Sequence, residues 1–514
     1  MTLTARLLML VAAALCFGVQ AVYFTHMLQL NSYRDERYRK WYGEHTATVV
    51  NWRRLLPAAV LAVALFPLDD ALTYGIAAGI FLLTALLNWP QKAKKPLVVT
   101  ARVRRLFLTE ALLLALLFAI SWLLGGWRGL FLLALLSTIV WFWVRLANLS
   151  NQPIEKKIAD SYVRDAAGRL RDMPGLTVIG ITGSYGKTST KMFLHALLSA
   201  KFNVLMTPES YNTTMGVVRT IREQLKPSHQ VFIAEMGAKN VGDIREICDL
   251  VHPRYGVLTS IGEQHLETFG SIDNIIRTKF ELVDALPPDG IAFLNTDNDY
   301  IRTRETDKRI VSYGLQQADY TASDISVDAG GTSFTVTAPD GESRRFTTKL
   351  LGAHILQNLT GCIAVAHTLG IPLEQLVYPV RMLKPVPHRL QLLPNGYIDD
   401  AYNSNPAGFR AALDVLSGFS SQRVLVTPGM VELGNRQDAL NRELGVYAAG
   451  RCDYAVLIGE RQAPPLKEGL LEGGFSPERI FVAHTLQEGL AHLHSLPTEG
   501  GRTVLLENDL PDNF

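Results

Sequence analysis

The stretch from Leu176 to Leu198, LTVIGITGSYGKTSTKMFLHALL, decides the fold of the larger part of this chain. It begins with a short apolar run rich in β-branched residues, 176–181, which predicts a buried parallel strand. A glycine turn follows at 183–186, and the apolar residues after it recur at near-helical spacing. The stretch therefore predicts a strand, a loop and a helix in direct succession.

The loop in this stretch is typical of a phosphate-binding site. Glycine reaches the φ values that fold backbone N–H groups around an anion, and the helix N-terminus adds positive dipole. In such a loop Lys187 reaches the β- and γ-phosphates, and the Thr188 hydroxyl ligates Mg²⁺. The strict pattern needs glycine at Ile181, whereas the nearest is Gly180, so a plain strand-to-helix turn is the alternative. We expect the nucleotide to be held by Thr182, Gly183, Ser184, Gly186, Lys187, Thr188 and Ser189.

Composition limits the class of protein. The 514 residues are enough for three or four domains, and the net charge of +2 gives no basic field for a nucleic-acid partner. Mean hydropathy is positive, +0.13, because the first 150 residues are strongly apolar. The four cysteines are far apart in the sequence and form no CxxC pair, which fits a reducing compartment.

Five apolar stretches in the first 150 residues predict a membrane domain of about five helices. They are Leu7 to Leu28, Leu55 to Leu68, Ala71 to Trp89, Leu106 to Leu124 and Gly129 to Leu149. A span needs about 20 apolar residues, and the second stretch is shorter and broken by Pro57 and Pro67, which also fits a re-entrant segment. We expect the first stretch to be a retained helix and not a signal peptide.

The lysines and arginines between these stretches predict the orientation. They gather after the first and third stretches: Arg34, Arg37, Arg39, Lys40, Arg53, Arg54, Lys92, Lys94, Lys95, Arg102, Arg104 and Arg105. With positive loops inside, the N-terminus lies outside and residue 150 onward is cytoplasmic, so we expect a multi-pass protein of the cytoplasmic membrane. The basic clusters either set topology alone or, with Tyr33, Tyr38, Trp41 and Tyr42, hold an anionic lipid headgroup or a lipid-linked substrate.

Two further residues follow predicted strands in the soluble part. Glu235 ends the apolar run 231–234, and His265 follows the run 257–261. Taken alone, Glu235 is explained as a helix N-cap partner and His265 as an ordinary core or surface histidine. In an open α/β sheet, however, ligand groups gather at the carboxyl ends of strands, where Thr188 is also expected. Together the three residues predict a Mg²⁺ site beside the phosphates.

The order of segments predicts an α-helical transmembrane domain followed by α/β domains. We expect the transmembrane domain at 1–150, a charged linker at 151–175, a central ATP-binding domain at 176–385 and a Rossmann-like domain at 386–514. Residues 305–350 alternate polar and apolar positions, which suggests a small antiparallel excursion.

Five motifs occur in the order that the Mur ligases have them, and the chain resembles that family over about 176–460. They are GITGSYGKTST, ESYNTTMG, FIAEMGA, IGEQHLETFGS with the later TKFEL, and IDDAYNSNP. The SYN, EMGA and IDDAYNSNP strings are most similar to the member that adds D-alanyl-D-alanine. The resemblance implies a P-loop central domain and a C-terminal Rossmann-like domain.

The resemblance also implies a mechanism. ATP phosphorylates a substrate carboxylate, a small amine or amino acid attacks the acyl phosphate, and an amide, ADP and phosphate leave. Glu235 and His265 would ligate Mg²⁺, and Lys279 would be the lysine that is often carbamylated and then also ligates Mg²⁺; an ordinary surface lysine is the alternative. By similarity, Arg389 would reach the terminal phosphates, Asp400 the ribose and Asn358 the adenine, while Asn212, Tyr402 and Asn403 would face the substrates.

The chain departs from the family pattern before the phosphate loop. Membrane helices fill the space of the usual UDP-sugar-binding domain, and Ile355 stands where asparagine is common. Met430 lacks the preceding aspartate, and LLENDLPDNF replaces a basic loop. We therefore expect a membrane-anchored amide ligase whose acceptor is a lipid-linked or cell-wall precursor carboxylate. A synthase that adds glutamate or a related amino acid repeatedly and an ATPase-driven membrane transporter are the alternatives; Glu110 near a span start is one of few charges in the spans.

Overall fold

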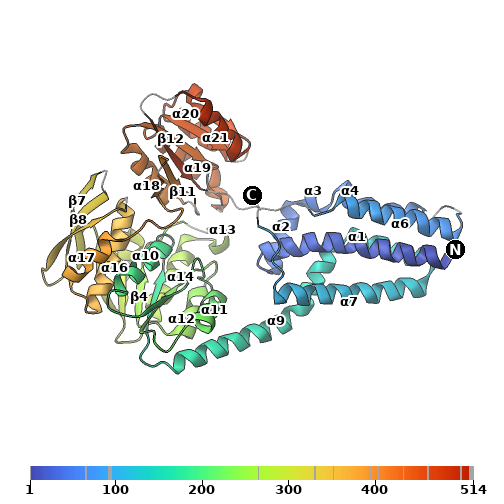
Figure 1. Ribbon diagram of the computed structural model, residues 1–514, viewed down its shortest axis with the longest axis horizontal. Coiled ribbons are helices and arrows are strands. Elements are labelled where there is room, and N and C mark those ends of the chain that lie inside the picture. Colours follow the sequence, from blue (N-terminus) through green and yellow to red (C-terminus); the bar gives the residue numbers. More distant parts are fainter. Residues whose placement is uncertain are drawn as a thin grey trace. The chain divides into compact units, whose positions relative to one another are not determined.

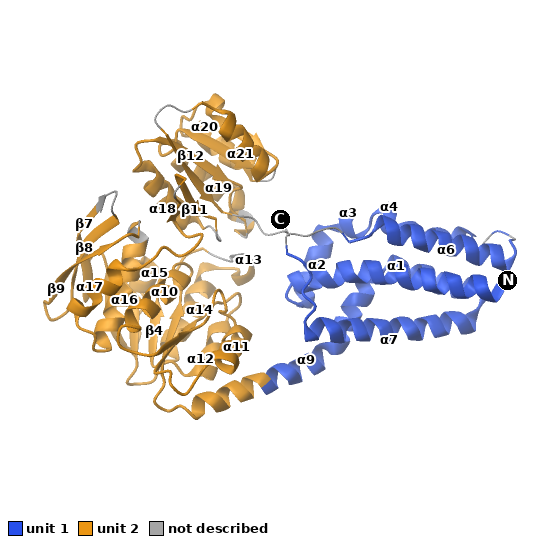
Figure 2. Ribbon diagram, viewed as in Figure 1, with its two compact units in different colours: residues 1–161 blue, residues 162–514 orange. Residues whose placement is uncertain are grey.

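The computed structural model describes residues 2–63, 66, 68–90, 95–263, 266–328, 331–350, 352–393, 395–401, 405–431, 433–459, 462–497 and 501–508. The chain forms two compact units, residues 1–161 and 162–514, which Figure 2 colours separately. Each unit has its own hydrophobic core.

Unit 1 is helical (Figure 1). Its helices are α1 (Thr2–Leu30), α2 (Asp35–Glu44), α3 (Thr46–Val49), α4 (Trp52–Leu55), η1 (Leu56–Ala58), α5 (Ala59–Val63), α6 (Asp70–Leu87), α7 (Ala101–Leu124), α8 (Gly126–Thr138) and α9 (Val140–Arg171). Among the described residues, α1, α6 and α7 are long and apolar enough to cross a membrane. A fourth span results if α8 and α9, which meet at 79°, count as one.

Three, or up to four, such helices among the described residues are fewer than the predicted number of about five, and the second predicted stretch includes residues outside the described ranges. The described residues 55–63 of the second predicted stretch are divided among the end of α4, η1 and α5, because Pro57 interrupts the helix near the start of η1. The fifth stretch is bent between α8 and α9.

Helices α1 and α7 lie side by side in opposite directions. Near the start of α1, the Arg6 guanidinium lies 4.0 Å from the ring centroid of Trp122 at the end of α7. Near the end of α1, His26 Nε2 lies 2.7 Å from the carbonyl oxygen of Lys95, which precedes α7. This pairing, together with the packing of α6 on α1, forms the core of unit 1.

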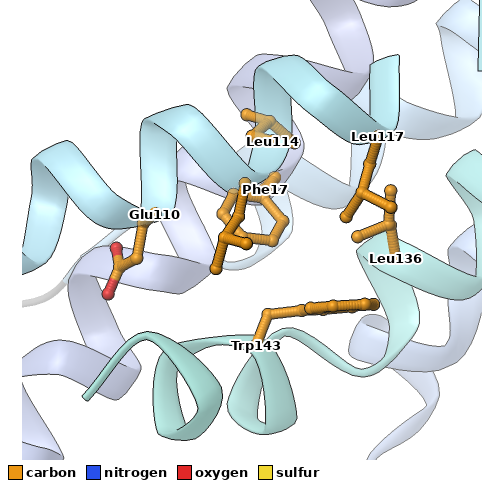
Figure 3. Close-up of a pocket in the computed structure, with 7 residues that line it drawn as sticks. Phe17, Glu110, Leu114, Leu117, Leu136 and Trp143 are labelled. Atoms are coloured by element: carbon orange, nitrogen blue, oxygen red, sulfur yellow. The ribbon is translucent and has the colours of Figure 1, made fainter. Parts of the chain in front are cut away.

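An acidic side chain is enclosed in this core. Glu110 on α7 is 4% exposed and lines a pocket with Phe17, Leu117, Trp143 and other apolar residues (Figure 3). The Thr25 hydroxyl on α1 donates to Glu110 Oε1 over 3.0 Å. This acidic side chain of unit 1 is thus buried with a hydrogen-bond partner.

Unit 2 contains a nine-stranded sheet. Its strands are β1 (Thr177–Thr182), β2 (Val204–Met206), β3 (Val231–Glu235), β4 (Tyr255–Leu258), β5 (Ile291–Asn295), β6 (Arg309–Gly314), β7 (Tyr320–Asp328), β8 (Gly331–Thr337) and β9 (Ser343–Thr348). The order is β2-β3-β1-β4-β5-β6-β7-β8-β9, parallel except for the pairs β7–β8 and β8–β9. The chain leaves β1 for β2 and β3 on one side and reaches β4 and β5 on the other, so β1 lies at the topological switch point.

Helices cover both faces of this sheet. They are α10 (Lys187–Leu198), α11 (Thr214–Gln224), α12 (Asp243–Val251), α13 (Leu266–Phe269), α14 (Ile272–Asp284), α15 (Asp299–Arg302), α16 (Ala353–Thr368) and α17 (Leu373–Arg381). Ile179 and Ile181 of β1 pack with α10 and α16, whereas Val178 packs in the core formed with α11, α12 and α14. This alternation follows from the period of two along a strand.

A second sheet of six strands completes unit 2. Its strands are β10 (Gln391–Leu392), β11 (Tyr397–Asp400), β12 (Gln422–Thr427), β13 (Tyr454–Ile458), β14 (Ile480–Ala483) and β15 (Arg502–Glu507), in the order β10-β11-β15-β12-β13-β14. Only β10 pairs antiparallel. The helical elements are α18 (Pro406–Ser417), η2 (Gly434–Arg436), α19 (Gln437–Ala449), α20 (Ala463–Glu472), η3 (Pro477–Arg479) and α21 (Leu486–Ser495).

The predicted fold class is confirmed: a helical region precedes two α/β sheets. Residues 151–171, predicted as part of a linker, continue α9. The domain boundaries at 150, 175 and 385 stay predictions.

Candidate active site

The loop between β1 and α10 is built on two glycines. Gly186 has a φ of +79°, and a Cβ there would lie 2.6 Å from Asn358 Nδ2 on α16. A Cβ on Gly183 would lie 2.1 Å from Thr259 Oγ1. Both positions require glycine, because one has a left-handed backbone and both are approached closely by neighbouring atoms.

The Lys187 side chain bends back over this loop. Its Nζ donates to the carbonyl oxygens of Gly183 (2.7 Å) and Ser184 (3.0 Å). Burial lowers the pKa of Lys187 from its usual 10.5 to about 8, the Glu235 carboxylate opposes this shift, and the positive charge of Arg389 adds to it. Lys187 is therefore within electrostatic reach of both residues.

Glu235, at the end of β3, is the acid of the site. It is 1% exposed, and its Oε1 accepts hydrogen bonds from Thr188 Oγ1 (3.2 Å) and Asn212 Nδ2 (3.1 Å). The register of β1 and β3 pairs Ile181 with Glu235, which explains why the acid lies beside the loop that follows β1. Thr188 and Glu235, which were both expected at the carboxyl ends of strands, therefore lie in contact.

Lys191 is a site residue that the sequence reasoning missed. Its Nζ lies 2.9 Å from Glu235 Oε2, and neither side chain is more than 1% exposed. A signal was present, because Lys191 follows Lys187 by four residues and so shares its face of α10. The Lys191 ammonium group therefore balances the negative charge of the buried Glu235 carboxylate.

Lys279 on α14 is also buried, with 3% of its surface exposed. Burial lowers the pKa of Lys279 well below its ordinary value, and the positive charge of Lys187 lowers it further. An ordinary surface lysine, the alternative considered from the sequence, is therefore wrong. Lys279 is therefore a buried amine whose surroundings favour its neutral form.

Arg389 lies in the segment that joins the two sheets of unit 2. It is flanked by two residues in the left-handed region, His388 (φ +59°) and Leu390 (φ +45°). Such non-glycine residues cost about 1–3 kcal/mol each, and they persist where the surroundings hold them. The Leu390 N–H donates to Asp400 Oδ1 over 3.1 Å, and His388 Nδ1 lies 2.7 Å from Asp399 Oδ2, so strand β11 fixes the turn that presents Arg389.

Asp400 lies behind this turn. Burial raises the pKa of Asp400 from 3.8 to about 6, while the Leu390 N–H and the Arg389 charge act in the opposite direction.

A small apolar pocket lies next to α10. It is lined by Ser189, Phe193, Leu350, Ile355, Pro385, Val386, Arg389 and Leu390. Ile355, which stands where the family commonly has asparagine, therefore contributes an apolar wall, and Arg389 contributes the charged edge. Asn358, which packs against Gly186, lies one helical turn further along α16.

The remaining predicted residues fall into two groups. The Thr182 hydroxyl donates to the Met236 carbonyl, and the Ser184 hydroxyl donates to the Gly262 carbonyl, so both hydroxyls anchor the loop to the segments that follow β3 and β4. His265, Tyr402 and Asn403 lie outside the described residues.

The residues present fit a magnesium ion. Thr188 and Glu235 offer a hydroxyl and a carboxylate oxygen 3.2 Å apart at the edge of the sheet, and Mg²⁺ prefers such hard oxygen ligands. When bound there, Mg²⁺ neutralises charge on phosphate oxygens. Thr188, Glu235 and a carbamate on Lys279 would hold it, and these roles stay predictions.

Comparison with known proteins agrees with this geometry. Residues 181–366 match the Mur ligase middle domain, and 388–507 match the Mur ligase, glutamate ligase domain. The UDP-N-acetylmuramoyl-tripeptide–D-alanyl-D-alanine ligase of Escherichia coli (strain K12) is 31% identical over 332 residues, which cover 61% of this chain and 73% of the relative. The enzyme of the same name from Synechocystis sp. is 31% identical over 395 residues, 72% of this chain and 84% of the relative.

A solved structure supports the same comparison. The MurF ligase from Thermotoga maritima in complex with ADP superposes with a TM-score of 0.62 at 27% identity, covering 68% of this chain and 80% of that chain.

Fold and site together define an α/β enzyme that handles phosphoryl groups: a glycine loop with its lysine, a buried carboxylate and an arginine meet at a switch point of the sheet. The chain belongs to the Mur ligase family. It is an ATP-dependent acid–amino-acid ligase of the Mur type, and the family assignment made from its motifs is confirmed.

Proposed function

We propose that this protein is a ligase of the cytoplasmic membrane that joins a membrane-confined cell-wall precursor carboxylate to a small amine or amino acid. The observation that carries the proposal is the convergence of Lys187, the Thr188–Glu235 contact and the charge of Arg389 at one edge of the sheet. The relatives named above act on a UDP-linked muramoyl tripeptide, which suggests a peptidoglycan-related acceptor.

Phosphoryl transfer to the carboxylate depends mainly on positioning and charge. Lys187 would release the carbonyls of Gly183 and Ser184 and turn to the ATP phosphates, whose charge favours its protonated form. Arg389 would meet the terminal phosphates from the other side. The product of this step is an acyl phosphate, which the amine attacks, so that the C–O bond to phosphate breaks as the C–N bond forms.

Lys279 is suited to carbamylation because CO₂ reacts with a neutral amine. Burial lowers the pKa of Lys279 and so favours that form. The carbamate would add two oxygen atoms close to Lys187 and so complete a set of hard ligands with Thr188 and Glu235.

The membrane part of the proposal rests on α1, α6 and α7, whose length and composition suit spans. Confinement of enzyme and acceptor to one membrane raises their effective concentration, and this removes the need for a nucleotide handle on the substrate. Basic loops on one side predict that the catalytic unit is cytoplasmic.

The test compares membrane extracts of cells that make wild-type protein or Lys187→Ala by mass spectrometry. We expect a carboxylate precursor to accumulate in the variant, because losing one charge-stabilising group costs about 10²–10³-fold in rate. Purified full-length enzyme should release phosphate only when an amine is added.

The outcomes separate the rivals. Phosphate release without any amine would contradict the ligase and favour the transporter. A ladder of products on a gel, in place of a single addition, would favour the synthase that adds amino acids repeatedly. If the detached cytoplasmic part turned over a soluble UDP-muramyl peptide as fast as the full-length protein does, the proposal of a membrane-confined acceptor would be wrong.

A further inference from the structure

Basic side chains gather where α1 ends and α7 begins. The described segment 95–109 holds Lys95, Arg102, Arg104 and Arg105 and no aspartate or glutamate. Directly beyond this segment α7 continues as an apolar candidate span. A cationic surface at the end of an apolar helix suits an anionic group at the boundary of the hydrocarbon layer.

Arg102 holds a defined position in this surface. Its guanidinium carbon lies 4.0 Å from the ring centroid of Tyr33. The Tyr33 hydroxyl accepts a hydrogen bond from Gln29 Nε2 (3.0 Å), and its carbonyl accepts one from Asn148 Nδ2 (3.2 Å). Contacts from α1 and α9 therefore fix the ring on which Arg102 rests.

The backbone conformation at Tyr33 also indicates that the position of its ring is fixed. Ser32 and Tyr33 are consecutive non-glycine residues with φ of +57° and +58°. Each costs about 1–3 kcal/mol, so the contacts to Tyr33 must outweigh this strain. The turn keeps the ring beneath the guanidinium.

The nearest carboxylate is already bound by another arginine. Arg105 donates from Nε (2.7 Å) and from its terminal nitrogen (2.8 Å) to the two oxygens of Glu155. Arg102 Nε lies 4.0 Å from the same carboxylate, too far for a hydrogen bond, and its side chain is 35% exposed. Stacking on Tyr33 satisfies no N–H group, so with respect to the described residues the Arg102 fork keeps donors for an external anion.

We propose that Arg102, supported by Tyr33, binds the phosphate of a phosphorylated lipid, of the long-chain alkyl or isoprenyl phosphate class. A planar guanidinium pairs with phosphate through two parallel hydrogen bonds, and its weak hydration suits an interface. The apolar flank of α7 lies beside the chain of such a lipid. The inference rests on the proposed function in one respect: it assigns the phosphate of a lipid-linked acceptor to this site.

The test measures binding of an isoprenyl phosphate to purified full-length protein in neutral detergent by native mass spectrometry, without ATP or amine. Arg102→Gln should weaken binding about 10- to 100-fold, the value of a charge-assisted hydrogen bond. Arg104→Gln is the matched control, because it removes the same charge from an exposed position two residues away. We expect it to change binding less than twofold.

Further variants keep the test decisive. Tyr33→Leu, which removes the ring, should weaken binding as Arg102→Gln does, and Tyr33→Phe should retain it; this pair replaces Arg102→Gln if that variant does not fold. Equal losses in Arg102→Gln and Arg104→Gln would overturn the site in favour of diffuse attraction. Equally tight binding of inorganic phosphate or phosphatidylglycerol would overturn the lipid phosphate assignment.

The assay also separates this inference from the ligase proposal. Lys187→Ala should bind the lipid phosphate as the wild type does, because Lys187 belongs to the other unit. If the wild-type protein did not bind the isoprenyl phosphate but still released phosphate in an amine-dependent way, the Arg102 site alone would be overturned.

Discussion

Each unit of this protein buries a glutamate, and the two are stabilised differently. Glu235 in unit 2 meets the ammonium group of Lys191 at 2.9 Å and two neutral donors besides. Glu110 in unit 1 meets the Thr25 hydroxyl at 3.0 Å. The catalytic unit thus places opposite charges in its interior. The helical unit gives its acid one hydroxyl partner and surrounds it with apolar side chains (Figure 3).

The difference follows from what each unit must hold. A site for polyphosphate and Mg²⁺ exchanges cations and anions, so it needs several charges whose sum stays balanced as ligands arrive. The interior of an apolar helical bundle holds no such ligand, and a charge buried there is costly. Removing single partners from the two glutamates measures this contrast.

The largest effect is expected for Lys191→Met, which keeps the length of the side chain and removes its charge. Glu235 is then a buried acid without its cation, and breaking a buried pair in this way costs about 3–5 kcal/mol. A urea titration followed by proteolysis of unit 2 gives the free energy of unfolding.

The control for Lys191→Met is the double variant Lys191→Met, Glu235→Gln. The double variant should regain much of the free energy of unfolding that Lys191→Met loses, because no unpaired buried charge remains. If the free energy of unfolding of Lys191→Met alone lies within about 1 kcal/mol of the wild-type value, the hydrogen bonds from Thr188 and Asn212 are sufficient to stabilise the buried Glu235 carboxylate.

The next effect concerns the backbone of the phosphate loop. Gly186→Ala places an L-residue in the left-handed region, at about 1–2 kcal/mol, and its Cβ would meet Asn358. We expect weaker ATP binding by calorimetry and a lower melting temperature. Gly175→Ala is the matched control, since a Cβ there meets nothing within 4 Å and its φ is not positive. Equal melting temperatures for both variants would contradict this reading of the loop.

The pKa of Lys187 predicts a pH dependence of ATP affinity. Near a pKa of about 8, Lys187 is charged at lower pH and neutral at higher pH. Phosphate favours the charged form and raises the pKa in the complex, so affinity is full below pH 8 and falls as pH rises. The dissociation constant should increase up to about tenfold between pH 8 and pH 9.

Lys187→Arg is the control for this pH profile, because arginine stays charged in that range. Its affinity should vary little from pH 7 to pH 9. A flat profile for the wild type would mean that the Lys187 charge does not contribute to ATP binding.

Much of the fold and part of the site could be predicted from the sequence, since both depend on local patterns. The glycine loop needs positive φ at Gly186, and the apolar strand 231–234 delivers Glu235 to the edge of the sheet. Lys191 and the left-handed turn around Arg389 were not predicted, because the first depends on which way α10 faces and the second on contacts with β11. The roles of His265, Tyr402 and Asn403 stay predictions.

The helical unit shows the same limit. Apolar stretches located the long helices, but the bend between α8 and α9 has no proline or glycine at the break. Gln20 Nε2 on α1 donates to the Ser137 carbonyl over 2.9 Å. In a continuous helix that carbonyl accepts from the residue four positions later, so a side chain from α1 enters the hydrogen-bond ladder and accounts for the bend. Such a contact is invisible to hydropathy.

The smallest effect is expected for Thr25→Val, which removes the only hydrogen bond to Glu110 among the described residues. Hydrogen bonds between membrane helices contribute about 0.6 kcal/mol on average and up to about 1.7 kcal/mol, so unfolding in detergent should require slightly less denaturant. Thr84→Val is the control, because the Thr84 hydroxyl donates to the Ile80 carbonyl within its own helix and its loss should leave stability nearly unchanged. Glu110→Gln should keep the contact, since an amide oxygen accepts as a carboxylate does. A loss from Thr25→Val as large as that from Lys191→Met would mean that both units depend equally on their buried acids, and the contrast between them would not hold.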